Sequence, residues 1–441
     1  MNNYKFIVLD DDPTGVQCIH NLYVYTEWDV ETLCNALCSE EPMFFLLTNS
    51  RAFSEEKTQA VHKEIAQNLL AASKKSGVDF VLISRGDSTL RGHYPLETDV
   101  LRNTIEQNSP VRFAGEILCP FFFEGGRITR DNVHYCLIGS KPVPAGDTEF
   151  ARDKTFGYRS SDLTEYIEEK TKGAYRAGNV LSVPLQWLRD NRTDSIISLL
   201  RTANGRKIIV NSETYQDLRV FTDAVNTALE DGMRFIFRVA ASFTRSIICQ
   251  EPSPLLEKSD LIPEGASRGG LIVVGSHTQK TTAQMASLLN NGEIESFEFS
   301  IKDVFCEQQG RLQLKNAADA ANRCIANGKT FLIYTERKLL YSDSADKSLD
   351  ISVKISSALS EAVAAISEKP GFIVVKGGIT SNDIALKGLH VKSALVAGQI
   401  RPGIPVWTLP ADNKFAGVPY IICPGNTGDE SLLSGIYSML K

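Results

Sequence analysis

The chain has 441 residues, enough for two or three domains of ordinary size. Hydrophobic residues make up 43% and charged residues 23% of the sequence, which excludes extensive disorder, and the net charge of −6 argues against a general nucleic-acid binder. No apolar stretch approaches the roughly 20 residues of a membrane-spanning helix, and the nine scattered cysteines form no zinc pattern. We therefore expect a cytoplasmic protein that binds small molecules rather than nucleic acid or membrane, with a homodimer as a candidate assembly.

Short apolar runs alternate with segments of helical period through most of the chain. Taken in chain order, the runs that we predict to be strands are residues 6–9, 44–47, 80–83, 208–210, 235–239, 271–274, 331–334 and 372–375. Between the second and third runs, residues 55–70 place Val61, Ile65 and Leu69 on one face of a predicted helix. Strands without strict polar alternation, separated by helices, are typical of parallel sheets covered on both faces. The predicted fold class is α/β, with mainly parallel sheets flanked by helices.

The clearest domain seam lies between residues 250 and 270. This stretch contains three prolines and several turn-forming residues, and a new apolar strand follows it. We predict a first domain of residues 1–255, a linker of residues 256–267 and a second domain of residues 268–441, all within ordinary domain sizes.

Polar segments follow three predicted strands of the first domain, and ligands of open parallel sheets bind at such strand ends. The first segment is Leu9-Asp-Asp-Asp-Pro-Thr-Gly15, and its carboxylates suit either a metal or a hydroxyl proton. A solvated acidic turn without function is the alternative. The second is Leu46-Leu-Thr-Asn-Ser-Arg51. The third segment, residues 83–92, carries the charged and hydroxyl side chains of Arg85, Asp87, Ser88, Thr89 and Arg91. These side chains are suited to binding a small polyhydroxy acid. The alternative is a loop in which they pair only with one another.

Two glycine-rich segments follow strands of the second domain, Val375-Lys-Gly-Gly-Ile-Thr-Ser-Asn-Asp383 and Cys423-Pro-Gly-Asn-Thr-Gly-Asp-Glu430. Glycines at such turns let backbone N–H groups approach a phosphate closely. Each turn alone is a weak signal, but together with Val274-Gly-Ser-His-Thr278 they favour a nucleotide site. The sequence contains neither a P-loop nor the dinucleotide-binding fingerprint.

One competing interpretation concerns the acidic turn. Leu9-Asp-Asp-Asp-Pro-Thr14 has the D-x-D-x-T form of a haloacid-dehalogenase-type phosphatase, in which Asp10 would be the nucleophile and Asp12 the general acid. That hypothesis leaves the 84–92 loop and the whole second domain without a role.

The complete set of motifs resembles the four-carbon acid sugar kinase family, which includes D-threonate, D-erythronate and 3-oxo-tetronate kinases. The motifs occur in one order over nearly the entire chain: Asp11-Asp-Pro-Thr-Gly15, Arg85-Gly-Asp-Ser-Thr-Leu-Arg-Gly92, Pro120-Phe-Phe-Phe-Glu-Gly-Gly-Arg127, Lys376-Gly-Gly-Ile-Thr-Ser381 and Gly425-Asn-Thr-Gly428. The resemblance implies an acid-sugar-binding first domain and an ATP-binding second domain, with the active site in the interdomain cleft. The expected reaction is transfer of phosphate from ATP to the C4 hydroxyl of a four-carbon sugar acid.

The resemblance assigns expected roles to residues of both domains. Asp12, or failing that Asp11, would orient the hydroxyl and take its proton. Candidate acceptor-binding residues are Arg51, Arg85 and Arg91 for the carboxylate, with Asp87 and Ser88 for the hydroxyls. Candidate ATP-binding residues are Ser276, Gly377, Gly378, Thr380, Ser381, Gly425 and Asn426. Mg²⁺ is expected from the chemistry, although the sequence does not single out its ligands.

The motifs also depart from the usual family pattern. Pro13 stands where the first motif commonly has Leu, and Ile379 stands where the glycine turn commonly has Glu. In the last turn, Pro424 and Thr427 replace Ser and Phe. The missing Glu removes a carboxylate that could contact ribose or Mg²⁺, and it points to a subgroup with its own substrate. A sugar-acid sensor without catalysis is a further alternative.

Overall fold

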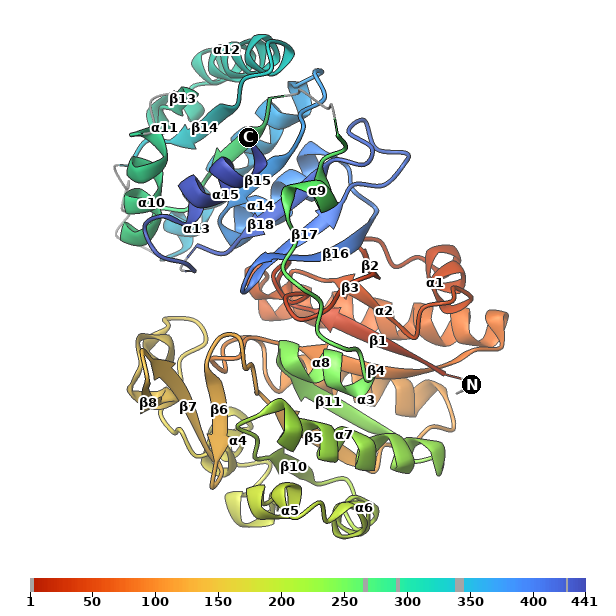
Figure 1. Ribbon diagram of the computed structural model, residues 1–441. Coiled ribbons are helices and arrows are strands. Elements are labelled where there is room, and N and C mark those ends of the chain that lie inside the picture. The colour runs from red at the N-terminus through yellow and green to blue at the C-terminus, as the bar shows by residue number, and fades with distance from the viewer. Residues whose placement is uncertain (1–3, 265–268, 291–293, 338–344, 426) are drawn as a thin grey trace. The chain divides into compact units, whose positions relative to one another are not determined.

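The structure is a computed structural model that describes residues 4–264, 269–290, 294–337, 345–425 and 427–441. The chain divides into two compact units, residues 1–252 and residues 253–441. Each unit contains a largely parallel sheet flanked by helices, as Figure 1 shows. The predicted α/β fold class is thus confirmed. None of the helices in the described residues is long and apolar enough to cross a bilayer.

The main sheet of the first unit is parallel throughout, and all five strands predicted there are present in it. Apolar residues fill most positions of its strands, as expected for a sheet buried on both faces. In spatial order the strands are β2 (Leu22–Tyr25), β3 (Met43–Leu47), β1 (Tyr4–Asp10), β4 (Asp79–Arg85), β11 (Phe235–Val239), β5 (Gly115–Cys119), β10 (Lys207–Val210) and β9 (Leu181–Val183).

The helix predicted at residues 55–70 is α2, which runs six residues further (Glu55–Ser76). The Ser54 side chain caps its first turn by accepting from the Lys57 N–H, and Gly77 ends it with a φ of 72°. Ile65 and Leu69 are fully buried in a core shared with β1, β3 and β4. The other helices of the unit are α1 (Val30–Leu37), α3 (Leu96–Asn108), α4 (Leu163–Lys170), α5 (Leu185–Arg189), α6 (Thr193–Arg201), α7 (Tyr215–Glu230) and α8 (Ala241–Ile247).

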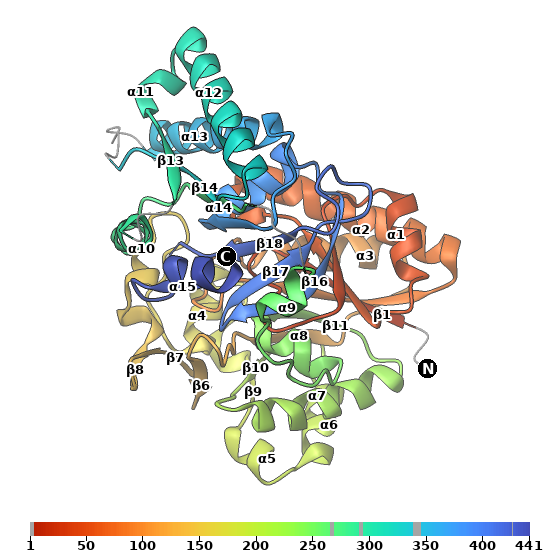
Figure 2. The same cartoon turned by 45° about the horizontal axis from the view of Figure 1, so that its top comes forward.

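A small antiparallel sheet in the first unit was not predicted. It consists of β6 (Arg127–Arg130), β7 (Val133–Ile138) and β8 (Lys141–Pro144), and Figure 2 shows these strands beside one another. Asp131 and Asn132 form the β6–β7 turn with φ values of 49° and 67°. Two successive positive φ values are typical of a tight hairpin turn. The sheet begins at Arg127, the last residue of the Pro120–Arg127 motif.

The sheet of the second unit is parallel except at one end. Its order is β13 (Glu295–Phe299), β14 (Phe331–Thr335), β12 (Leu271–Val274), β15 (Ile373–Lys376), β18 (Pro419–Cys423), β17 (Ile404–Thr408) and β16 (Ser393–Arg401). The strands predicted at 271–274, 331–334 and 372–375 correspond to β12, β14 and β15. The last two pairings, β18 with β17 and β17 with β16, are antiparallel.

The helices of the second unit complete its core, in which Ile272, Val374 and Ile436 are buried together. They are α9 (Lys258–Leu261), α10 (Gln279–Leu289), α11 (Ile301–Val304), α12 (Glu307–Ala326), α13 (Ala345–Ala365), α14 (Gly378–Asp383) and α15 (Leu432–Leu440). Part of the segment expected to be a linker packs on this unit, since Leu261 and Ile262 belong to the same core.

Register places the motif loops of the first unit along one edge of its sheet. Asp10, the last residue of β1, is aligned with Leu47 of β3 and with Arg85 of β4. Arg85 is in turn aligned with Val239 of β11. Because parallel strands end at the same edge, the loops that follow β1, β3 and β4 lie next to one another.

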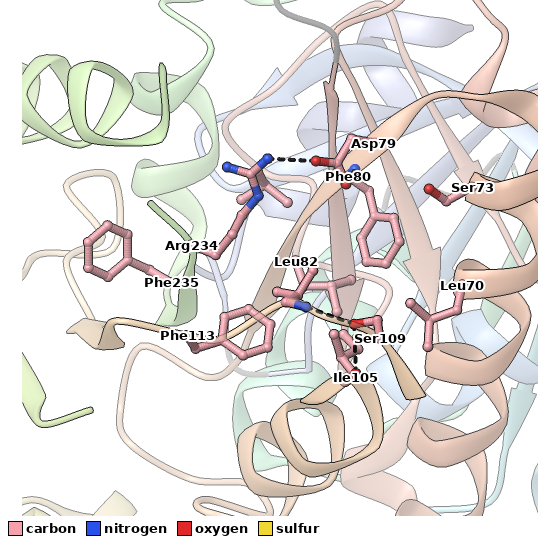
Figure 3. A pocket seen from close by; sticks show the side chains of 12 residues that line it. Leu70, Ser73, Asp79, Phe80, Leu82, Ile105, Ser109, Phe113, Arg234 and Phe235 are labelled. Atoms are coloured by element: carbon pink, nitrogen blue, oxygen red, sulfur yellow. Dashed lines mark hydrogen bonds and ion pairs between the residues drawn. The ribbon is translucent and has the colours of Figure 1, made fainter. Parts of the chain in front are cut away.

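A cavity of about 160 Å³ lies elsewhere in the first unit, and Figure 3 shows its lining. Phe80, Phe113 and Leu70 supply apolar surface, and Arg234 forms an ion pair with Asp79 at 2.6 Å. Asp79 and Phe80 begin β4, whereas the motif loop follows the end of that strand. The cavity is therefore separate from the motif residues.

Candidate functional site

The acidic turn after β1 is held by two arginines. Arg51 binds Asp11 with two hydrogen bonds, Nε to Oδ2 at 3.1 Å and Nη2 to Oδ1 at 2.7 Å. Arg85 Nη1 lies 3.1 Å from Asp10 Oδ1 and 3.3 Å from Asp11 Oδ1. Two buried carboxylates thus share the positive charge of two guanidinium groups, which offsets the cost of removing them from water.

Asp12 differs from its two neighbours because its side chain is 18% exposed, whereas those of Asp10 and Asp11 are 2% and 1% exposed. Its Oδ1 accepts from the N–H and the hydroxyl of Thr14, and its Oδ2 lies 3.5 Å from Arg51 Nη1. Burial alone would raise the pKa of Asp12, but Arg51 and the Thr14 hydrogen bonds lower it below its ordinary value. Asp12 is therefore an ionised, fixed carboxylate with access to a ligand.

Asp10 is poorly suited to be the nucleophile of a phosphatase. Burial raises the pKa of Asp10 to about 7, despite the nearby Arg85. A Cβ added at Gly15 would lie 2.0 Å from both of its carboxylate oxygens, so the turn closes directly over the side chain. The Asp10 carboxyl thus lies buried beneath the backbone of the turn, with a raised pKa and little room for an attack on a substrate.

The loop after β4 contains a second pair of charges. Arg91 Nε donates to Asp87 Oδ2 at 2.7 Å, and its Nη1 lies 3.8 Å from Asp153 Oδ2. The guanidinium also lies over the Phe150 ring, 5.1 Å from its centroid. Burial alone would raise the pKa of Asp87, but the nearby guanidinium groups of Arg51 and Arg91 hold this pKa well below its ordinary value. Asp12, Arg51, Asp87 and Arg91 thus form one chain of alternating charges at the sheet edge.

The backbone of this loop is fixed by buried aromatic and imidazole side chains. His134 Nε2 donates to the Ser88 carbonyl oxygen at 2.8 Å, and its Nδ1 accepts from the Thr129 hydroxyl at 2.9 Å. Burial lowers the pKa of His134 to about 4, so the ring is neutral at physiological pH. The Tyr158 hydroxyl donates to the Thr89 carbonyl oxygen at 2.8 Å.

Arg238 and Glu97 are site residues that the sequence analysis missed. The buried Arg238 guanidinium on β11 pairs with Glu97 of α3 and donates to Ser84 Oγ at 3.0 Å. A Cβ added at Gly86 would lie 2.3 Å from this guanidinium, so the motif loop packs directly on it. Glu97 also accepts from the Ser50 hydroxyl at 2.5 Å. The sequence feature that could have indicated Arg238 is a charged residue inside the otherwise apolar strand Phe235-Ile-Phe-Arg-Val239.

Three turns of the second unit, after β12, β15 and β18, are also brought together. The hydroxyls of Thr278 and Thr281 each lie 3.0 Å from the Gly425 carbonyl oxygen. A Cβ added at Gly275 would lie 2.2 Å from Thr380 Oγ1, and one added at Gly425 would lie 3.0 Å from Ser276 Oγ. The glycines therefore allow close approach of the three turns, with Ser276 and Thr380 between them.

The turn after β15 has its own internal support. Gly377, with a φ of 120°, precedes α14, which begins at Gly378. Ser381 is fully buried, and its hydroxyl donates to the Gly377 carbonyl oxygen at 2.8 Å. Its side chain thus supports the turn from the interior. Asn426 lies outside the described residues.

Two cations that contact these turns were not among the predicted site residues. Arg337 Nη1 donates to the Ser276 carbonyl oxygen at 2.7 Å, and its Nη2 donates to the Thr282 hydroxyl at 2.8 Å. Lys376 Nζ donates to the Pro424 carbonyl oxygen at 2.6 Å. Both cations hold backbone next to the glycines. In the part of the chain that the structure describes, no cluster of three or more His, Cys, Asp or Glu side chains could hold a metal.

The geometry of each unit agrees with comparisons with known proteins. Residues 6–247 match the family model of the sugar-binding N-terminal domain, and residues 271–433 match that of the nucleotide-binding C-terminal domain. No curated protein matches the chain in sequence.

Two solved structures share the fold at low sequence identity. A Salmonella typhimurium LT2 protein described as a candidate tRNA synthase is 15% identical, with a TM-score of 0.71, and the match covers 98% of each chain. A Haemophilus influenzae protein is also 15% identical, with a TM-score of 0.63, over 99% of this chain and 100% of that one. At this level of identity the likeness extends to the fold alone. The match over residues 6–247 shows that the chain belongs to the sugar-binding N-terminal domain family, here followed by a nucleotide-binding C-terminal domain, an arrangement that fits the four-carbon acid sugar kinases.

Proposed function

We propose that the protein is an ATP-dependent kinase that phosphorylates the C4 hydroxyl of a four-carbon sugar acid such as threonate, erythronate or a 3-oxo-tetronate. The observation that supports this most is the presence, in one chain, of an Asp–Arg cluster in a sugar-binding domain and of glycine-lined turns in a nucleotide-binding domain. Phosphoryl transfer depends mainly on positioning the reactants and neutralising charge.

The acceptor would bind through its carboxylate to Arg51 and Arg91, whose side chains are 21% and 24% exposed. A guanidinium group can bind a carboxylate with two parallel hydrogen bonds. Arg85 is only 5% exposed and is bound to Asp10 and Asp11, so in this proposal it supports the turn. Asp87 and the backbone at Ser88 would face the acceptor hydroxyls.

Asp12 is the candidate catalytic residue, with Asp11 as its neighbour fixed by Arg51. A carboxylate whose pKa is below its ordinary value stays ionised and accepts a hydrogen bond from the attacking hydroxyl. Such a weak base suits a loose transition state, in which the hydroxyl proton is lost late and orientation matters more than deprotonation.

In the second domain, nucleotide phosphates would approach the backbone where a Cβ would obstruct them. Mg²⁺ would enter bound to ATP and would neutralise charge on the transferred phosphoryl group. The residues proposed to contact the nucleotide are Ser276, Gly377, Gly378, Thr380, Gly425 and Asn426, with Ser381 as an interior support.

The decisive experiment measures ATP consumption by the purified protein with a panel of four-carbon sugar acids that differ in configuration at C2 and C3. We expect one or a few acids to stimulate ADP formation strongly, with phosphate recovered on C4. An Asp12→Asn variant is the control for a contaminating kinase, because its turnover should collapse. Phosphate release from sugar phosphates without nucleotide would instead support the phosphatase. Saturable acid binding with no ADP formation for any acid would support the sensor.

A further inference from the structure

Lys376 connects all three turns of the candidate nucleotide site. It is the last residue of β15, and its side chain is fully buried. Its ammonium donates to the carbonyl oxygens of Pro424 at 2.6 Å and Thr427 at 3.2 Å, in the turn after β18. Its own carbonyl oxygen accepts from the N–H groups of Gly275 and Ser276, both at 3.2 Å, in the turn after β12. One residue therefore fixes the spacing of the three turns.

The charge of this ammonium is not balanced by the protein that surrounds it. Both side-chain acceptors are neutral carbonyl groups, and no carboxylate of the described residues forms an ion pair with Lys376. The ionisable groups that act on it are the Cys423 thiol of β18 and the Lys280 ammonium of α10, and the second of these is also positive. A buried charge without an ionic partner is costly, and burial lowers the pKa of Lys376 to about 8.

We propose that Lys376 is a positioning residue of the nucleotide site, whose ammonium holds the three turns together and whose missing counter-charge is supplied by the phosphates of the bound nucleotide. This inference rests on the proposed function, because it requires a nucleotide at these turns. The nucleotide should bind the form in which Lys376 is protonated. Binding should therefore raise the pKa of Lys376 and take up a proton when the pH is above about 8.

The first test is the pH dependence of ADP affinity, measured by isothermal titration calorimetry between pH 7.5 and 9.5. The phosphates are fully ionised in this range, because their second pKa is near 6. With a pKa of about 8 in the free protein and a much higher one in the complex, affinity should fall roughly 20-fold over the range. Lys376→Arg, which stays protonated throughout, should bind ADP with no such fall.

The second test compares Lys376→Met with Lys414→Met at pH 7.5. Lys414 is the control: it is exposed, but its ammonium also donates to backbone carbonyl groups, those of Val363, Ala364 and Ile366. None of these carbonyls belongs to the three turns. We expect Lys376→Met to weaken ADP binding about tenfold or more and Lys414→Met to leave it unchanged.

Several results would overturn the inference. One is that folded Lys376→Met binds ADP as tightly as the wild type. Another is that the ADP affinity of Lys376→Arg falls with pH in the same way as that of the wild type. If Lys376→Met does not fold, as thermal unfolding would reveal, the profile of Lys376→Arg decides alone. Failure of the wild type to bind ADP at any pH would refute the proposed function itself, and the inference with it. ADP binding that is independent of Lys376 would refute only the inference.

Discussion

Replacing Asp10 with Asn tests the electrostatics of the acidic turn. Asn has nearly the same shape and keeps an oxygen for Arg85, but it cannot ionise. Burial raises the pKa of Asp10 from 3.8 to about 7, so between these values the folded protein holds a proton that the unfolded chain releases. Stability from Asp10 is therefore fully present below about pH 4 and is lost as pH rises to about 7.

The size of the effect follows from the shift of about three pH units. At about 1.4 kcal/mol per unit, the unfolding free energy of wild type should fall by up to about 4 kcal/mol relative to Asp10→Asn between pH 4 and pH 7. Above pH 7 the difference should be constant. The pH dependence of the wild-type unfolding free energy alone is less informative than the difference from Asp10→Asn. The lowered pKa of His134 makes the folded protein more stable as the pH rises from 4 to 6.5, which opposes the effect of Asp10.

The assay is urea denaturation of both proteins at half-unit steps from pH 4 to pH 8, with the difference in unfolding free energy plotted against pH. Asp231→Asn is the control for replacing a carboxylate with an amide at the surface, where Asp231 pairs with Arg201. A flat curve for Asp10→Asn would show that Asp10 is ionised throughout and would refute the reasoning. In the kinase assay, Asp10→Asn should also retain far more activity than Asp12→Asn, whereas a phosphatase that uses Asp10 would lose all activity.

Three further predictions concern the two binding sites. Asp12→Asn should lower kcat by about 100-fold or more while KM for the acid changes only a few-fold, and a change confined to KM would contradict the catalytic role. Arg91→Lys should lower kcat/KM for the acid about 10- to 100-fold, because an ammonium cannot form the double hydrogen bond, while the ADP dissociation constant stays the same. A weaker ADP complex with normal acceptor kinetics would reverse the assignment of the domains. Gly275→Val should abolish ADP binding in calorimetry, because its Cβ would lie 2.2 Å from Thr380 Oγ1, whereas Gly435→Ala, which has open space, should bind normally. Normal ADP binding by folded Gly275→Val would exclude close approach at this turn.

The sequence was informative where burial dictates residue type. Strands buried on both faces need continuous apolar runs, so β1, β4 and β12 were predicted from residues 6–9, 80–83 and 271–274. The small sheet of β6–β8 was missed because it contains short strands that carry polar residues on both faces, such as Thr129 and Arg130 on β6.

The partners of individual charges could not be predicted from residue order. Arg51, Arg85 and Arg91 have the same chemistry in the sequence, yet Arg85 alone is buried beneath the turn. The depth of a side chain depends on its neighbours in space, and Arg85 is paired with the buried carboxylates of Asp10 and Asp11. The orientation of Ser381 could not be predicted from the sequence either, because its hydroxyl donates to the Gly377 carbonyl oxygen in the interior.

The position of Arg238 restricts how this loop can vary in evolution. Its guanidinium occupies the space into which a side chain at Gly86 or Gly92 would project, with distances of 2.3 Å and 2.7 Å from a Cβ built at each. A larger residue at either glycine therefore requires the Arg238 guanidinium to move, and that movement would weaken its pairing with the buried Glu97 carboxylate. These four positions should consequently change together among homologues, and single substitutions at any one of them should be rare.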